Sequence, residues 1–193
     1  MPDSDRHSTV KSLWAKACKH DSDLKTQPPP DAESLLRFEA EAGFPPQADW
    51  VQWLQICNGC ALSEDFWVSS FYGVWDRPIR QRDLDAARML RRPFFAEWRR
   101  LQRIPIADDG CGNYLLLGQP FPGAPTSVVM FWDQANDYHE FEYVVATDLW
   151  VFLRAVLEHL DSKKGWPFNK RTLFSIDPAM VSIPEKFRPD GDE

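Results

Sequence analysis

Two short stretches hold the residues whose types and spacing could do chemistry. Cys57 and Cys60 form a C-x-x-C pair, a spacing that can cycle through a disulfide or hold zinc. Asp108 and Asp109 lie in the stretch IPIADDGCGNYLLL, at 104–117, where two carboxylates could act as general acid and base or bind a divalent cation. The glycines of the same stretch could cradle a phosphate.

The expected position of the cysteine pair in the fold argues against a redox function. A reactive thiol is activated at a helix N-terminus, whereas Cys57 is expected at a helix C-terminus, where the helix dipole disfavours thiolate. A zinc site needs two more ligands, and neither Cys18, Cys111 nor the four His residues show a second paired spacing. We therefore expect no metal site and no disulfide, and interpret the cysteines as small buried hydrophobic residues.

The glycine stretch is typical of a hairpin turn. Gly110 and Gly112 can take positive φ without steric cost, and Asp109 and Asn113 bond readily to nearby backbone. No P-loop lysine or following helix signal supports phosphate binding, and adjacent aspartates do not face each other across a substrate. The sequence also lacks hydrolase-elbow, zinc-protease and deaminase signatures, so we expect no enzyme, no catalytic residue and no cofactor.

The elements that must position these residues follow from periodicity and turn signals. We expect a first helix capped by Thr9, a second from an Asp31 cap to Gly43, and a third that runs to Cys57 and ends at Asn58-Gly59. Shorter helical segments are expected at 84–90 and 93–101, and a last helix capped by Thr147.

Strand signals fall around residues 66–75 and at 103–107, 114–117, 128–132 and 141–146. Because the links between the last four of these strands are short, the sheet should be mostly antiparallel, with about four to six strands packed against N-terminal and C-terminal helices. The fold class is therefore α+β, with one domain.

Three regions divide the chain. Residues 1–30 hold an N-terminal helix and a Pro-rich linker, 31–160 the domain, and 161–193 a Pro-rich extension expected to wrap the domain with little regular structure. The start lacks a signal-peptide pattern and no apolar run is long enough to span a membrane, so a cytoplasmic location is expected.

Charge is distributed unevenly along this chain, whose formal net charge is −7. Residues 104–153 hold no Lys or Arg, while 80–103 hold eight Arg. The arginines could bridge neighbouring acids on a solvated face, or grip nucleic acid together with Phe94, Phe95 and Trp98. The aromatic spacing is that of a helix face turned to the core, and the chain is acidic, so direct nucleic-acid binding is not expected.

The order of these signals resembles the SMI1/KNR4 family of the SUKH superfamily over roughly residues 32–160. The resemblance rests on Glu41-Ala42-Gly43-Phe44, Asp49-Trp50, Trp53-Leu54, Asn58-Gly59, the hairpin at 104–114, Phe131-Trp132-Asp133 and the helix start at 149–153. Its structural motif residues are Gly43, Asn58, Gly59, Gly110, Gly112 and Trp132. Pro45-Pro46 replaces the family's Leu-Pro step, Cys60 follows the Asn-Gly pair, and the short family pattern covers neither the Arg-rich segment nor the tail.

The resemblance implies a single SUKH-like domain that acts as an immunity protein, which binds and neutralises a cognate toxin. Toxins that target nucleic acid are frequently basic, which fits the stretch without Lys or Arg. The expected binding face comprises the acidic residues Asp108, Asp109, Asp133, Asp137, Glu140 and Glu142. The alternatives are a regulatory or scaffolding protein of the fungal type and a thiol or metal enzyme built on Cys57 and Cys60. The partner is a protein, no membrane is involved, and a monomer or weak dimer is expected.

Overall fold

The computed structural model describes residues 3–20, 24, 26–62, 68–75, 84–135, 141–159 and 170–189. Over these residues the chain forms six strands and seven α-helices, with three short 3-10 helices. The strands are β1 (Cys60–Ala61), β2 (Ser70–Phe71), β3 (Ile104–Asp108), β4 (Tyr114–Gly118), β5 (Val128–Trp132) and β6 (Tyr143–Ala146). The α+β class is confirmed.

One sheet contains all six strands in the order β1-β2-β3-β4-β5-β6, and every neighbouring pair is antiparallel. Short links account for the pairing of β3 with β4, β4 with β5 and β5 with β6, whereas the chain between β2 and β3 carries α4, η1 and α5. Its register aligns Ser70 with Asp108, Asp108 with Tyr114, and Tyr114 with Trp132, so one row of side chains crosses four strands.

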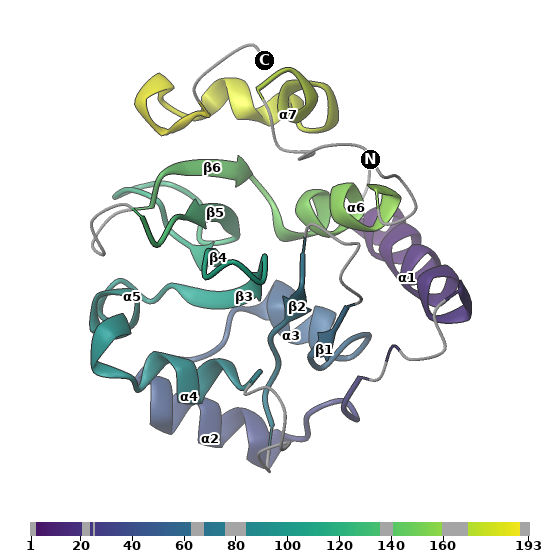
Figure 1. The fold of residues 1–193 in the computed structure, drawn as a ribbon, viewed down its shortest axis with the longest axis vertical. Coiled ribbons are helices and arrows are strands. Elements are labelled where there is room, and N and C mark those ends of the chain that lie inside the picture. The colour runs from purple at the N-terminus through teal and green to yellow at the C-terminus, as the bar shows by residue number, and fades with distance from the viewer. Residues whose placement is uncertain are drawn as a thin grey trace.

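Helices pack on the sheet in two groups. In Figure 1, α1 lies against α6 at one side, and α2 lies against α4 at another. The helices are α1 (Asp3–His20), α2 (Ala32–Ala42), α3 (Ala48–Leu54), α4 (Ala86–Leu90), η1 (Pro93–Phe95), α5 (Ala96–Arg100) and α6 (Leu149–His159). Trp53 of α3 and Trp14 of α1 both pack edge-on against Phe71 of β2, at 5.3 and 6.2 Å between ring centroids, which joins the first group to the sheet.

The second helix begins and ends where the sequence predicts. The Asp31 carboxylate accepts a hydrogen bond from the Ser34 amide at 2.8 Å, and Gly43 adopts φ +83° as the C-cap. Two other expected caps are wrong. Thr9 lies inside α1, where its hydroxyl donates to the Asp5 carbonyl, and Asp148 rather than Thr147 caps α6 by accepting from the Trp150 and Val151 amides.

The third helix is shorter than expected, because α3 ends at Leu54 and a turn carries the chain to Cys57. The expectation of little regular structure in the last thirty residues is also wrong. That segment forms α7 (Lys170–Ile176), η2 (Pro178–Ser182) and η3 (Glu185–Phe187). Prolines at 178 and 184 explain the error: they start the two 3-10 helices instead of preventing them.

The C-terminal elements are fixed to the domain by one buried carboxylate and one aromatic stack. Asp177 is buried and accepts hydrogen bonds from the amide and hydroxyl of Thr147, at 2.7 and 2.8 Å. Phe187 of η3 stacks on Phe121, with ring centroids 5.1 Å apart. These contacts hold the end of the chain above β6 in Figure 1.

Candidate partner-binding site

The hairpin between β3 and β4 is held by its own carboxylates. Asp109 Oδ1 accepts from the amides of Cys111 and Asn113, at 2.8 and 3.1 Å, and its Oδ2 accepts from the Asn113 side chain at 2.7 Å. Asp108 Oδ1 accepts from the Gly110 amide at 2.9 Å. Asp109 therefore accepts three hydrogen bonds within the turn, and Asp108 accepts one from the turn backbone.

The glycines of the turn are required by conformation and by space. Gly110 and Gly112 adopt φ +77° and +102°. A Cβ atom at Gly112 would lie 2.4 Å from the Gln134 Oε1 atom, and one at Gly110 would lie 2.9 Å from the Ser69 Oγ atom. Both glycines thus have a conformational role in the turn between β3 and β4.

Gln134 joins the hairpin to the loop that follows β5. Its amide donates to the Asn113 Oδ1 atom at 3.1 Å, and its side-chain nitrogen donates to the Cys111 carbonyl at 2.6 Å. Asp133 is thereby brought beside the hairpin, and its own Oδ1 accepts from the Ala135 amide at 2.7 Å. Two loops far apart in sequence thus form one surface.

Four of the six acidic residues expected on the binding face lie at this end of the sheet. Glu142 is there because its amide donates to the Phe131 carbonyl just before β6 begins. We call these four residues the acidic end: Asp108, Asp109, Asp133 and Glu142. Glu142 is exposed and the other three are half-buried. Asp137 and Glu140, the remaining two, lie outside the described residues.

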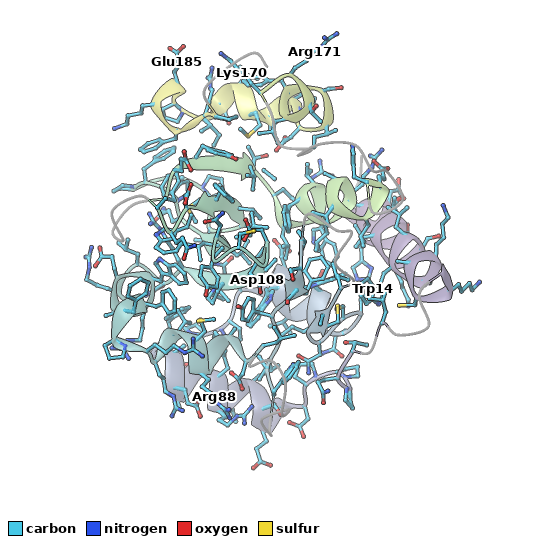
Figure 2. The ribbon with its side chains drawn as sticks, viewed as in Figure 1. Trp14, Arg88, Asp108, Lys170, Arg171 and Glu185 are labelled. Atoms are coloured by element: carbon cyan, nitrogen blue, oxygen red, sulfur yellow. The ribbon has the colours of Figure 1, made fainter. Side chains whose placement is uncertain are left out.

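A cavity of about 360 Å³ opens between the hairpin and α4. We call it the hairpin pocket, and its lining residues are Ser70, Tyr72, Leu84, Met89, Arg92, Asp108, Gly110, Gly112 and Tyr114. Its polar lining groups are the carboxylate of Asp108, the phenol groups of Tyr72 and Tyr114, and the guanidinium of Arg92. Figure 2 shows Asp108 beside the sheet, well inside the outline of the molecule.

Both tyrosines remain neutral at physiological pH. Burial, followed by the negative charge of Asp108, raises the pKa of Tyr72 and that of Tyr114 above the ordinary phenol value. Arg92 opposes this shift at both hydroxyls, and Asp108 has the larger effect at each.

An aromatic cluster packs against Tyr114, one of the residues that line the pocket. Trp132 is buried and lies 5.7 Å from the Tyr114 ring and 5.1 Å from the Trp98 ring, and Phe95 stacks on Trp98 at 4.1 Å. Phe95 and Trp98 face the core as predicted, whereas Phe94 is half-exposed. The cluster fixes the position of Tyr114 and thus the shape of the pocket.

A family comparison agrees with this geometry. The profile described as "SMI1 / KNR4 family (SUKH-1)" matches residues 29–155, which is more than half of the chain. The chain belongs to the SMI1/KNR4 family. A comparison with curated proteins gives no match.

The Asn-Gly motif expected of this family has a structural role here. Asn58 is buried, and its side chain donates to the carbonyls of Pro28 and Val74 and accepts from the Val74 amide. Gly59 adopts φ +76°, and a Cβ atom there would lie 2.6 Å from the Trp75 Nε1 atom. The pair ties the Pro-rich linker to the domain that the family profile covers.

Three arginines of the Arg-rich segment are engaged within the molecule. Arg103 is buried, donates to the carbonyls of Gln119 and Pro120, and lies 5.0 Å from the Phe141 ring centroid. Arg100 pairs with Glu97 at 2.5 Å, and Arg91 lies 3.7 Å from Glu41. Arg80 and Arg82 lie outside the described residues. The contacts favour bridging of neighbouring acids over a nucleic-acid grip.

Burial distinguishes the cysteine pair from a reactive site. Cys57 and Cys60 are both buried, with their sulfur atoms 3.7 Å apart, and burial raises the pKa of the Cys57 thiol. Within the described ranges, no cluster of three or more His, Cys, Asp or Glu side chains could hold a metal ion. The other two cysteines are more accessible: Cys111 is exposed at the hairpin tip, and Cys18 is half-buried.

Sequence reasoning missed the residues that close the pocket. Tyr72 lies in the segment recognised as strand, and Met89 and Arg92 in segments recognised as helix or its link, but no spacing signal brings the three together. Their convergence depends on the packing of α4 against β3.

Among the helices that the structure describes, none has the length and apolar character needed to cross a bilayer.

Proposed function

We propose that this protein is a non-catalytic binding domain that neutralises a basic, nucleic-acid-targeting protein toxin by covering it. The observation that supports the proposal is the acidic end, where Gln134 holds the hairpin that bears Asp108 and Asp109 next to the loop that bears Asp133. Residues 104–153 contain no Lys or Arg, and the basic residue that lines the pocket beside Asp108 is Arg92. Membership of the SMI1/KNR4 family supports the role, since bacterial members commonly act as immunity proteins.

Electrostatic complementarity is the means by which such a surface works. A negative patch steers a basic partner to the correct face and raises the association rate, with an effect that weakens as salt increases. A toxin surface that binds nucleic acid must be positive, so the acidic end competes with the toxin's own substrate. Inhibition then needs contact only and no chemical step.

The test is a titration of the toxin's activity. The candidate partner is the protein encoded immediately upstream, or one captured from the native strain, and its nuclease or deaminase activity is measured while this protein is added. Occlusion predicts that activity falls linearly to zero at one equivalent. Loss of activity at a few hundredths of an equivalent would show turnover and contradict the proposal, and unchanged activity of a bound partner would favour the scaffolding alternative.

A further inference from the structure

We propose that the hairpin pocket receives the side chain of one arginine of the partner protein. This inference rests on the proposed function and adds a specific anchor to it. Surface charge alone would give a diffuse attraction, whereas a pocket gives one position on the partner that must match. Anchors of this kind, an arginine in a desolvated pocket, carry much of the affinity at many protein interfaces.

The size of the pocket suits one side chain. Ligand cavities in proteins commonly hold about 300–1,000 Å³, so the volume of about 360 Å³ is at the small end of that range. The pocket also lies at the acidic end, because Asp108, Gly110 and Gly112 belong both to the hairpin and to the pocket lining. A basic partner drawn to the acidic end would meet this opening directly.

The chemistry of the walls fits a guanidinium group better than an ammonium group. Asp108 offers a carboxylate, and Tyr72 and Tyr114, whose ring centroids lie 6.3 Å apart, line the same pocket. A planar guanidinium can bond a carboxylate and stack on an aromatic face at the same time. Leu84 and Met89 supply apolar surface for the aliphatic stem of the guest.

The pocket lining holds one carboxylate, that of Asp108, and one guanidinium, that of Arg92. At the hydroxyls of Tyr72 and Tyr114 the effect of Asp108 exceeds that of Arg92. The strands that bear Asp108 and Tyr114 contribute no basic residue, since none occurs at 104–153. Arg92 therefore reduces the attraction for a cationic guest without reversing it, and its removal should strengthen binding.

The experiment titrates the full chain with Nα-acetyl-arginine methylamide at low salt and follows the amide signals by NMR. We expect saturable shifts concentrated at Ser70, Tyr72 and Tyr114, with a dissociation constant in the millimolar range. The norleucine and glutamate analogues of the probe should give no saturable shift. Asp108→Asn should weaken binding at least tenfold, while Glu39→Gln, which removes the same charge from an exposed site on α2, should leave it unchanged.

Asp108→Asn keeps an oxygen that can accept from the Gly110 amide, so the turn should survive. If that variant nonetheless fails to fold, Arg92→Gln serves instead and should tighten probe binding about threefold. Shifts that scatter over the acidic surface without saturating, equal binding by Asp108→Asn, or weaker binding by Arg92→Gln would overturn the proposal. The proposed function would survive any of these results if one equivalent of the protein still abolished the toxin's activity.

Discussion

Asn58→Ala should be among the most destabilising single substitutions in this chain. The Asn58 side chain makes three hydrogen bonds: it donates to the carbonyls of Pro28 and Val74, at 2.7 and 3.0 Å, and accepts from the Val74 amide at 2.8 Å. Asn58 is only 3% exposed, so water cannot replace these partners without entering the domain. Each buried group left unsatisfied costs about 1–3 kcal/mol.

With the Val74 amide and at least one carbonyl left unpaired, the expected loss of unfolding free energy is about 3–5 kcal/mol. For a chain of this length, each kcal/mol shifts the melting temperature by about 2–4 °C, which gives a decrease of roughly 6–20 °C. The assay is urea and thermal denaturation followed by circular dichroism. The unfolding free energies of wild type and variant are compared where the two urea curves have the same m-value.

Asn113→Ala is the matched control for this substitution. The Asn113 side chain makes two hydrogen bonds, to the Asp109 carboxylate and from the Gln134 amide, at a turn where water can reach these groups. We therefore expect Asn113→Ala to lower the unfolding free energy by about 1 kcal/mol. If Asn58→Ala cost less than the control, the buried network would not hold the linker to the domain, and the structural interpretation of the Asn-Gly motif would be refuted.

Three further outcomes follow from the same structure. Gly112→Ala should cost about 1–3 kcal/mol in unfolding free energy, because the residue has positive φ and its Cβ atom would meet the Gln134 side chain. Asp177→Ala should release the C-terminal segment, which limited proteolysis would detect as cleavage ahead of any cleavage in the domain. In the folded protein iodoacetamide should label Cys111 rapidly and leave Cys57 unmodified. Burial raises the pKa of the Cys57 thiol, so the stabilisation that the buried neutral thiol provides is intact below the ordinary thiol pKa of 9.0 and declines as the pH rises above that value.

The first of these predictions has a control variant, and each of the other two has a result that would contradict it. Gly43→Ala has positive φ but an open environment for the added Cβ, so it should cost about 1 kcal/mol, less than Gly112→Ala. Equal costs would contradict the close approach of Gln134 to the hairpin. Proteolysis of Asp177→Ala that begins inside the β-sheet would contradict a local release, and labelling of Cys57 as fast as that of Cys111 would contradict its burial.

Local signals predicted the parts of the fold that depend on neighbours in sequence. The Asp31 cap, the Gly43 end of α2 and the bounds of β5 at 128–132 follow from residue types within a few positions. The N-cap of α6 shows the limit of such rules, because the sequence predicts Thr147 and the structure has Asp148. Both residue types suit a cap, but Thr147 is hydrogen-bonded to Asp177, thirty positions away.

The candidate site could be predicted only in outline. The acidic residues were recognised by charge, but the connection of the hairpin to the next loop depends on Gln134, a residue with no distinctive local pattern. The pocket depends on Met89 of α4 and on Arg92, which follows that helix, and the periodicity that predicts a helix at 84–90 does not show that these residues meet the hairpin. Contacts between distant segments are set by packing, which periodicity does not record.

The most direct test of the central claim reverses charge at the acidic end and measures affinity for the toxin as a function of salt. Asp133→Lys with Glu142→Lys is compared with Glu39→Lys and Glu185→Lys, which change the net charge equally at exposed sites elsewhere; Figure 2 shows Glu185 far from Asp108. The account predicts at least a hundredfold weaker binding and a flatter salt dependence for the first pair only. Equal affinity and equal salt dependence in both variants would contradict it.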